Sequence, residues 1–291
     1  MPSGPGRPTE GIAAMTEGPT GPRGAAALEP ARFDEADGLV RMEAARPRWE
    51  WAADAEGSLR ALPIPVSGGP PGGYNARVEF QSAFDPSLVP AFGRAADFLG
   101  RVITGDKAAG RLADGRFVDD LLIDATVTGI DGPGGTLAAA GPTAVRGDGT
   151  PGAGIMVFDE ADALDQRAAG TWGDVVLHEM LHVVGLGTIW DAAGLLARAG
   201  GTLRFTGENA IAAYEDAFPA IAASDRFSAR GVPVEEDGGP GTAGGHWDEE
   251  VFGRELMTGF VDRDTFVSDL TVASLEDLGY DTVFEPPVDI L

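Results

Sequence analysis

The feature that most constrains the fold of this chain is a pair of histidines inside the apolar run TWGDVVLHEMLHVVGLGTIW, at residues 171–190. If the run is helical, apolar residues surround His178 and His182 on nearly every side, and a helix that is apolar all round is buried. Gly185 supplies a helix stop. The run therefore predicts a buried helix over residues 172–184, around which the rest of the domain packs.

The two histidines are four residues apart, which places both imidazoles on one face of the helix. At that spacing their nitrogens can share one zinc ion at about 2.0–2.1 Å. Glu179 is turned about a quarter of the way round the helix from the first histidine, where its carboxylate can reach water without taking a ligand position. Burying these polar groups is costly unless a partner satisfies them, and a metal ion with its water does so. We therefore interpret the motif as a catalytic zinc site.

The composition of the chain limits the choice of a third zinc ligand. The chain contains three histidines and no cysteine, so a third nitrogen ligand can only be His246. The short metzincin spacing would place a histidine six residues after the second one, where this chain has Thr188. A thermolysin-like site would instead take a glutamate, with Glu208 and Glu215 as candidates. The segment GGHWDEEVFGRELMTG, at residues 244–259, favours the histidine, but the residues alone leave both arrangements open.

Several segments between residues 74 and 284 share the order and spacing of one peptidase family. They are HEMLHVVGLGTIW (178–190), the stretch around Gly245-His246-Trp247, ELMTG (255–259) and SDLTVASLEDLGY (268–280), with VEFQSAF (78–84) and IDGPGGTLAAAGPTAVR (130–146) upstream. In these segments the chain resembles the leishmanolysin-type metallopeptidases. These form the metzincin branch in which a long insertion separates the glycine after the helix from the third histidine.

The resemblance implies a set of site residues and a fold. It implies one zinc ion per chain held by His178, His182 and His246, with Glu179 as the catalytic carboxylate and Met257 as the methionine of the turn beneath the zinc. The implied fold is an α+β, metzincin-like catalytic domain with a twisted mixed sheet, a zinc-binding active-site helix and a loop-rich C-terminal subdomain. The cysteines of the eukaryotic members are absent, so their disulfides are not implied here.

The expected reaction is hydrolysis of peptide bonds in peptide or protein substrates. Zinc lowers the pKa of water and polarises the scissile carbonyl, and Glu179 acts as the general base. By resemblance to metzincins, we expect the short strand at Ile155–Phe158 to be the sheet edge on which a peptide lies extended. The alternative from another class is a non-catalytic surface or adhesion module with structural zinc. An intact Glu179 argues against that alternative, because a purely structural site has no use for the carboxylate.

The chain divides at a cluster of prolines and glycines that ends near Gly73. Residues 1–24 contain eleven glycines or prolines and almost no large apolar residue, a composition that cannot offset the entropy of ordering. We therefore expect residues 1–72 to be a poorly ordered tail and linker. Residues 73–291 then form the catalytic domain, with an N-terminal subdomain over 73–185 and a C-terminal subdomain over 186–291.

Local patterns predict further elements of the catalytic domain. Alternating apolar residues indicate a strand, and apolar residues three or four apart after a capping residue indicate a helix. The expected elements are a strand over 74–81, a helix from Pro86 to Thr104 capped by Asp85, strands over 121–130 and 155–158 separated by a Gly/Pro-rich loop over 129–154, a capping box of Thr171 and Asp174, and a last helix from Ser268 to Leu278.

The net charge of −25 would repel both a phosphate backbone and an anionic membrane, so we expect no nucleic-acid partner. Apolar runs are shorter than the ~20 residues of a transmembrane helix, and we expect no transmembrane segment. The first thirty residues also lack the apolar core of a secretory signal peptide. We expect a secreted or extracellular protein without a recognisable signal peptide, with an intracellular location as the alternative.

Acidic residues offer two further candidate features. Oxygen ligands could bind calcium, but these aspartates lack an EF-hand spacing, so we expect solvated charge at Asp119, Asp120, Asp124 and Asp131. A second acidic group flanks the third histidine and could favour substrates with basic side chains. Its members, which we expect to be mostly solvated, are Glu235, Glu236, Asp237, Asp248, Glu249 and Glu250.

Overall fold

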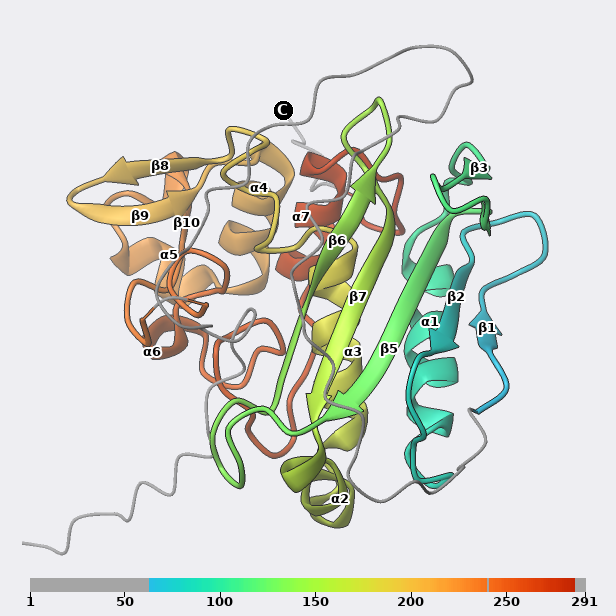
Figure 1. Ribbon diagram of the computed structural model, residues 1–291. Helices are drawn as coiled ribbons and strands as arrows, with labels where there is room; N and C mark the ends of the chain where they lie inside the picture. Colours follow the sequence, from blue (N-terminus) through green and yellow to red (C-terminus); the bar gives the residue numbers. More distant parts are fainter. Residues whose placement is uncertain (1–62, 240, 286–291) are drawn as a thin grey trace, which may run out of the picture.

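A mixed sheet of five strands forms one layer of the structure, a computed structural model that describes residues 63–239 and 241–285 (Figure 1). The strands lie in the order β1 (Val66–Gly68), β2 (Ala76–Phe80), β5 (Leu121–Thr128), β7 (Pro151–Asp159) and β6 (Ala138–Val145). The three central strands run parallel, and each edge strand is antiparallel to its neighbour. The twisted mixed sheet and the helices packed on it make an α+β fold, as the sequence predicts.

Two helices cover one face of this sheet. Helices α1 (Pro90–Val102) and α3 (Trp172–Val183) pack against each other there, and α2 (Glu160–Ala169) follows β7 directly (Figure 1). Aromatic rings fill the space between sheet and helices in edge-to-face pairs, with centroids 4.9 to 6.4 Å apart. These rings belong to Phe80, Phe84, Phe92, Phe158 and Trp172.

The rest of the chain forms a smaller sheet and several short helices. These elements are the β3 (Gly110–Arg111) and β4 (Phe117–Val118) pair, the sheet of β8 (Leu196–Ala199), β9 (Thr202–Phe205) and β10 (Val232–Pro233), helices α4 (Glu208–Ala217), α5 (Pro219–Ser224), α6 (Glu249–Phe252) and α7 (Asp269–Asp277), and a 3-10 turn at Ser228–Arg230. Helix α4 packs against α7 beside the end of the large sheet (Figure 1). Within the described ranges, the helices are all too short or too polar to span a bilayer.

Helix α1 begins four residues later than the sequence pattern predicts. Asp85 and Pro86 form a turn instead, in which the backbone N–H of Leu88 donates to the carbonyl of Asp85 at 2.9 Å. Pro90 explains the difference, because a proline ring clashes with the carbonyl four residues earlier in a continuous helix. Pro90 therefore takes the first helical position, where its missing N–H costs nothing.

The predicted Gly/Pro-rich loop over 129–154 contains a strand, β6, so that prediction is wrong. Alanine, glycine and proline make most of this strand and conceal the usual strand pattern. Pro142 is tolerated because β6 is an edge strand whose register with β7 shifts between Pro142 and Ala144. Because β6 occupies the edge, the expectation of an edge at Ile155–Phe158 is also wrong: β7 lies between β5 and β6.

Strand β1 lies within the range that the sequence assigns to the tail and linker. It pairs antiparallel with β2, with Val66 opposite Val78 and Gly68 opposite Ala76. The ladder uses backbone groups, so a short strand that ends in glycine leaves no apolar pattern for sequence analysis to detect. Residues 1–62 of the expected tail lie outside the described residues.

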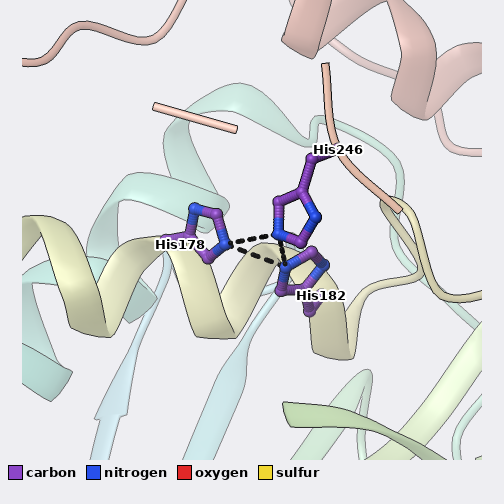
Figure 2. A group of neighbouring side chains, drawn as sticks. All are labelled: His178, His182 and His246. Carbon is purple, nitrogen blue, oxygen red and sulfur yellow. Dashed lines mark hydrogen bonds between the residues drawn. The ribbon is translucent and has the colours of Figure 1, made fainter. Parts of the chain in front are cut away.

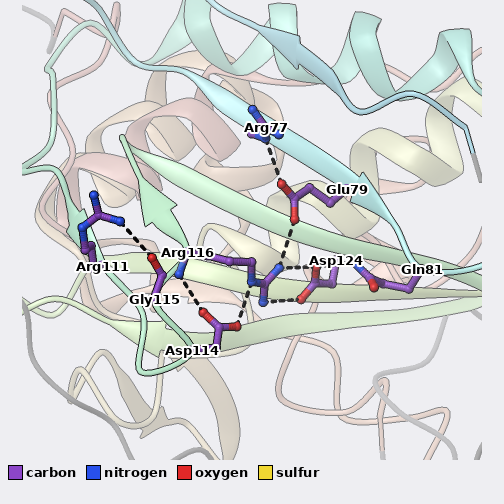
Figure 3. A network of polar contacts seen from close by, with 8 residues as sticks. All are labelled: Arg77, Glu79, Gln81, Arg111, Asp114, Gly115, Arg116 and Asp124. Atoms are coloured by element: carbon purple, nitrogen blue, oxygen red, sulfur yellow. Dashed lines mark hydrogen bonds and ion pairs between the residues drawn. The ribbon is translucent and has the colours of Figure 1, made fainter.

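An ionic network attaches the β3–β4 pair to the large sheet (Figure 3). Both terminal nitrogens of Arg116 donate to the Asp124 carboxylate, at 2.7 and 2.9 Å, and the same guanidinium bonds Glu79 and Asp114. Asp120 is buried and accepts hydrogen bonds from the backbone N–H groups of residues 75 and 107. The expectation of solvated charge is therefore wrong at Asp120 and Asp124, which are structural.

Candidate metal centre

Helix α3 supplies the first two histidines, as the sequence predicts. The expected capping box is absent, because the Thr171 hydroxyl makes no cap and donates instead to the side-chain oxygen of Gln166 at 2.5 Å. The helix is fixed at this end by Trp172, whose indole N–H donates to the carbonyl of Leu88 at 3.0 Å. Tertiary contacts thus set the start of α3.

The other end of α3 turns sharply at Gly185. This residue has φ +112°, a backbone conformation that favours glycine, and a Cβ there would lie 2.7 Å from a methyl of Ile189. The turn is closed by the N–H of Leu186, which donates to the carbonyl of Leu181 at 3.1 Å. It brings the carbonyl of Leu186 back to the ring of His182, 2.8 Å from Nδ1.

Three imidazoles converge at the end of this helix (Figure 2). His178 and His182 come from α3, and His246 comes from the segment that precedes α6. The three Nε2 atoms lie 2.9, 3.0 and 3.2 Å from one another. All three side chains are buried, at 0%, 2% and 0% exposure. Residues 68 positions apart in the sequence thus present three nitrogens to one point.

The second nitrogen of each ring identifies its tautomer. Nδ1 lies 2.7 Å from the Leu256 carbonyl in His178, 2.8 Å from a carbonyl in His182 and 2.9 Å from the Thr242 carbonyl in His246. A carbonyl oxygen only accepts, so each Nδ1 carries the ring proton. Each neutral ring therefore directs an unprotonated Nε2 at the other two.

The electrostatics of the centre keep these nitrogens without protons. Burial and the neighbouring imidazoles lower the pKa of His178 well below its ordinary value and lower that of His182 to about 3. Burial lowers the pKa of His246 to about 4. Three buried lone pairs that face one another need a cation between them. Nitrogens at ~2.1 Å from one tetrahedral Zn²⁺ lie about 3.4 Å apart, close to the spacings found here, so the residues fit the ion.

Glu179 follows the first of these histidines on α3. Its side chain is 1% exposed, within the same buried region as the imidazoles. The helix turns it about 100° away from His178, so it is adjacent to the centre without being one of the converging groups. A buried carboxylate beside a candidate zinc site has the chemistry of a general base.

Met257 and the two tryptophans near the centre are part of the core. The backbone N–H of Trp247 donates to the carbonyl of Met257 at 2.9 Å, which joins the segment of the third histidine to the segment of Met257. Trp190 and Trp247 are fully buried, with ring centroids 4.6 Å apart. Both rings pack in the core, where each contacts the ring of Phe205.

The glutamates considered as alternative ligands lie elsewhere. Glu208 and Glu215 are exposed on α4, and Glu215 accepts a hydrogen bond from the Ser228 hydroxyl at 3.2 Å. Within residues 63–239 and 241–285, the three histidines are the group of His, Cys, Asp or Glu side chains whose ligand atoms come close enough to hold a metal. The geometry thus favours a histidine over a glutamate as third ligand.

Part of the acidic group around the third histidine is structural, against the expectation of solvated charge. Glu235 is buried and accepts from the backbone N–H groups of Asp237 and Glu249, at 2.7 and 3.1 Å. The Asp248 carboxylate caps α6. Glu236 accepts from a backbone N–H and pairs with Arg198 at 2.6 Å. The hydrogen bonds of these carboxylates stabilise the conformation of the segment around the third histidine.

Beside the metal centre, sequence reasoning missed the buried carboxylate of Glu255 and the three carbonyls that select the tautomers. Glu255 is 0% exposed and lies two residues before Met257. Little in the sequence indicated its burial, because Glu255 is the first residue of ELMTG and follows Arg254, and acidic side chains are rarely fully buried. The carbonyls have no sequence pattern, because every residue carries one.

Fold and site together present a histidine triad that could hold a metal ion, with two of its members on a buried helix beside a mixed sheet. The comparison with protein families makes this specific: the leishmanolysin family model matches residues 112–285, more than half of the chain. The chain belongs to the leishmanolysin family, whose members are zinc-dependent metallopeptidases. No curated protein matches the chain.

Proposed function

We propose that this protein is a zinc-dependent endopeptidase. His178, His182 and His246 hold one zinc ion per chain, Glu179 is the general base, and Met257 forms the turn beneath the metal. One observation carries the proposal, the convergence of three unprotonated Nε2 atoms whose Nδ1 partners are backbone carbonyls. Membership of the leishmanolysin family supports the peptidase activity.

The protein's own groups have defined parts in the reaction. When bound, zinc supplies a Lewis acid that acidifies water and polarises the scissile carbonyl. The three neutral imidazoles of His178, His182 and His246 would hold the ion without adding negative charge, which would preserve its strength as a Lewis acid. Glu179 takes the proton of the attacking water and delivers it to the leaving amine. The bond is cleaved without a covalent link between enzyme and substrate.

Strand β6 replaces Ile155–Phe158 as the proposed binding edge for a peptide. It is the last strand on its side of the large sheet, and α3 packs against it. An edge strand offers unpaired backbone groups, so an extended peptide can add to the sheet beside α3, the helix that carries His178 and His182. Affinity for the substrate then comes from hydrogen bonds to its backbone. These do not require a chain end, so they suit cleavage within a polypeptide.

The arrangement of the domain is proposed as in metzincins. Residues 73–185 form the N-terminal subdomain with four of the five strands of the large sheet, to which β1 adds an edge, and residues 186–291 form the loop-rich C-terminal subdomain that supplies the third histidine. Surface or extracellular locations are typical of the family, which supports the proposal that this protein acts outside the cell.

The test of the proposed function combines metal analysis with digestion. Purified protein is expected to contain one zinc per chain and to digest casein, and a chelator is expected to abolish digestion. Replacing His246 by Ala removes one of three ligands and is expected to weaken zinc binding severely. Glu215→Ala, an exposed residue of α4, is the matched control and is expected to keep zinc and activity. Zinc retained after His246→Ala and lost after Glu215→Ala would contradict the proposal.

A further inference from the structure

A fully buried carboxylate lies close to the metal centre without belonging to it. Glu255, at 0% exposure, precedes the methionine turn. Its Oε1 accepts from the backbone N–H and hydroxyl of Ser268, at 3.0 and 2.9 Å, and from the hydroxyl of Thr271 at 2.6 Å. Its Oε2 accepts from the backbone N–H of Met257 at 2.6 Å. Four donors thus satisfy one carboxylate, which joins the start of α7 to the methionine turn.

The bond to Met257 reaches one metal-site histidine through a single peptide group. The N–H of Met257 and the C=O of Leu256 belong to the same planar unit and point in opposite directions. Oε2 of Glu255 holds the N–H end, and Nδ1 of His178 donates to the C=O end at 2.7 Å. An acceptor on the N–H side polarises the peptide group and makes its carbonyl a stronger acceptor, and this in turn makes the far nitrogen of the imidazole more basic.

A second chain of contacts leads toward the third histidine. The Thr271 hydroxyl donates to Glu255 and accepts from the indole N–H of Trp247 at 2.9 Å. Trp247 directly follows His246, and its backbone N–H donates to the carbonyl of Met257. Glu255 is therefore bonded directly to the Leu256–Met257 peptide, which accepts from His178, and is linked through Thr271 to the segment of His246.

We propose that Glu255 is a positioning residue of the metal centre. It orients the Leu256–Met257 peptide toward His178 and, through Thr271 and Trp247, fixes the segment of the third histidine. This inference rests on the proposed function, since it takes the three histidines as zinc ligands. It assigns Glu255 no contact with substrate or metal. Glu255 affects the affinity of the site for zinc and the arrangement of the ligands around the ion.

The test compares Glu255→Gln with Asp159→Asn. Glutamine keeps the size of the side chain but presents an NH₂ group to one of its donors, so one set of bonds is lost. Asp159 is the matched control because it is also fully buried and accepts from four backbone N–H groups, those of residues 130, 131, 132 and 161. Both variants are expected to lower the melting temperature of the zinc-free protein, as any loss of a buried carboxylate does.

Measurements of metal binding distinguish a positioning role of Glu255 from a purely structural one. Zinc affinity, measured by competition with a chelator, is expected to fall about 10- to 100-fold in Glu255→Gln and to stay at the wild-type value in Asp159→Asn. The visible absorption of the cobalt-substituted protein is expected to change in the first variant and not in the second. A folded Glu255→Gln with wild-type affinity and spectrum would overturn the inference, as would equal weakening in both variants.

Two further measurements test the role of Glu255: the zinc affinity of a second variant and zinc binding by the wild-type protein. If Glu255→Gln does not fold, Thr271→Val keeps the carboxylate and cuts the link to Trp247. A smaller loss of zinc affinity, about 3- to 10-fold, is then expected, and an unchanged affinity would overturn the inference. Wild-type protein that binds no zinc would overturn the proposed function and this inference together. Wild-type protein that binds zinc while Glu255→Gln binds it as tightly would overturn this inference alone.

Discussion

At the scale of single residues, the backbone selects the chemistry of the centre. A histidine binds a metal through a nitrogen that carries no proton, and its other nitrogen decides which one that is. Here three carbonyls, those of Leu186, Thr242 and Leu256, hold the three Nδ1 protons. They come from the turn after α3 and from two loops, so the state of each ring depends on how those segments fold.

Glu179→Ala separates an enzyme from a zinc-stabilised module. If Glu179 only accepts and delivers a proton, its loss leaves zinc content and folding nearly intact. Hydrolysis of a quenched peptide is expected to fall at least 10²- to 10⁴-fold, the range typical for losing a general base. The measurement pairs zinc content with turnover for wild type and variant. Equal turnover would contradict the role of Glu179, and no turnover in either zinc-loaded protein would favour the adhesion module.

The lowered pKa values predict how zinc affinity depends on pH. Three ordinary imidazoles with a pKa of about 6.5 would lose more than a thousandfold in affinity between pH 6.5 and 5.0, because protons compete for the ligands. His182 and His246, with pKa values of about 3 and 4, stay neutral in this range. We expect the folded protein to lose less than about tenfold, measured by chelator competition. A thousandfold loss in protein that circular dichroism shows to be folded would contradict this.

The same pKa shifts set the sign of a stability effect in the zinc-free protein. Below pH 6.5 the histidines of the unfolded chain become protonated, whereas those of the folded chain stay neutral because their pKa values are lowered. The unfolded state then binds more protons, so stability is fully present above the unfolded pKa and is lost as the pH falls toward the folded values.

At the scale of elements, the turn after α3 has a specific test in Gly185→Ala. The positive φ and the short approach to Ile189 both oppose a side chain there, so we expect a destabilisation of about 1–3 kcal/mol. Zinc affinity is expected to fall as well, because the turn carries the carbonyl that holds His182. Denaturant unfolding of the zinc-free protein and chelator competition give the two values.

Gly170→Ala is the matched control for this prediction. Gly170 ends α2 with φ +87°, but a Cβ there has open space around it. It is expected to lose about 1 kcal/mol from backbone strain alone and to bind zinc like the wild type. If both variants lose stability and neither loses zinc affinity, the turn at Gly185 does not position its histidine.

Periodicity predicted the elements whose side chains make the core and missed those defined by backbone pairing. Strands β2 and β5 and helices α3 and α7 carry regular apolar patterns, and the structure confirms them. Strand β6 is made of alanine, glycine and proline, and β1 has three residues, so neither has a pattern to read. Helix α2 is largely polar on a short segment and was not predicted.

The candidate site was predictable where composition left no choice. A chain with three histidines and no cysteine offers His246 alone as a third nitrogen ligand, and the structure brings it to the other two. The partners of the rings were beyond prediction, because backbone carbonyls are present at every position. Glu255 was recognisable only once its burial and its four donors were known.

At the scale of the whole molecule, the last described segment of the chain packs against the end of α1. The N–H of Val283 donates to the carbonyl of Val102 at 2.9 Å, and Ile103 pairs with Thr282 in an isolated bridge. The Lys107 ammonium donates to the carbonyl of Gly279 at 2.6 Å. The segment after α7 therefore fastens the end of α1, so the two proposed subdomains share contacts beyond the metal centre.

Strand β1 makes the start of the catalytic domain testable at this scale. It is the edge of the large sheet opposite β6, and α1 lies between it and α3 (Figure 1). It also packs tightly on α1, since a Cβ at Gly68 would lie 2.4 Å from the backbone nitrogen of Asp97. Removing β1 should thus reduce stability without disturbing the histidines.

Two shortened chains test the proposed boundary. A chain of residues 64–291 keeps every described strand and is expected to fold, bind zinc and cleave peptides like the full protein. A chain of residues 73–291 lacks β1, and we expect it to keep zinc affinity and activity while melting several degrees lower, at about 2–4 °C per kcal/mol for a domain of this size. Thermal unfolding, chelator competition and peptide turnover are measured on both. If the chain of residues 64–291 is insoluble or inactive while the full protein works, the first 63 residues assist folding and do not form a dispensable tail.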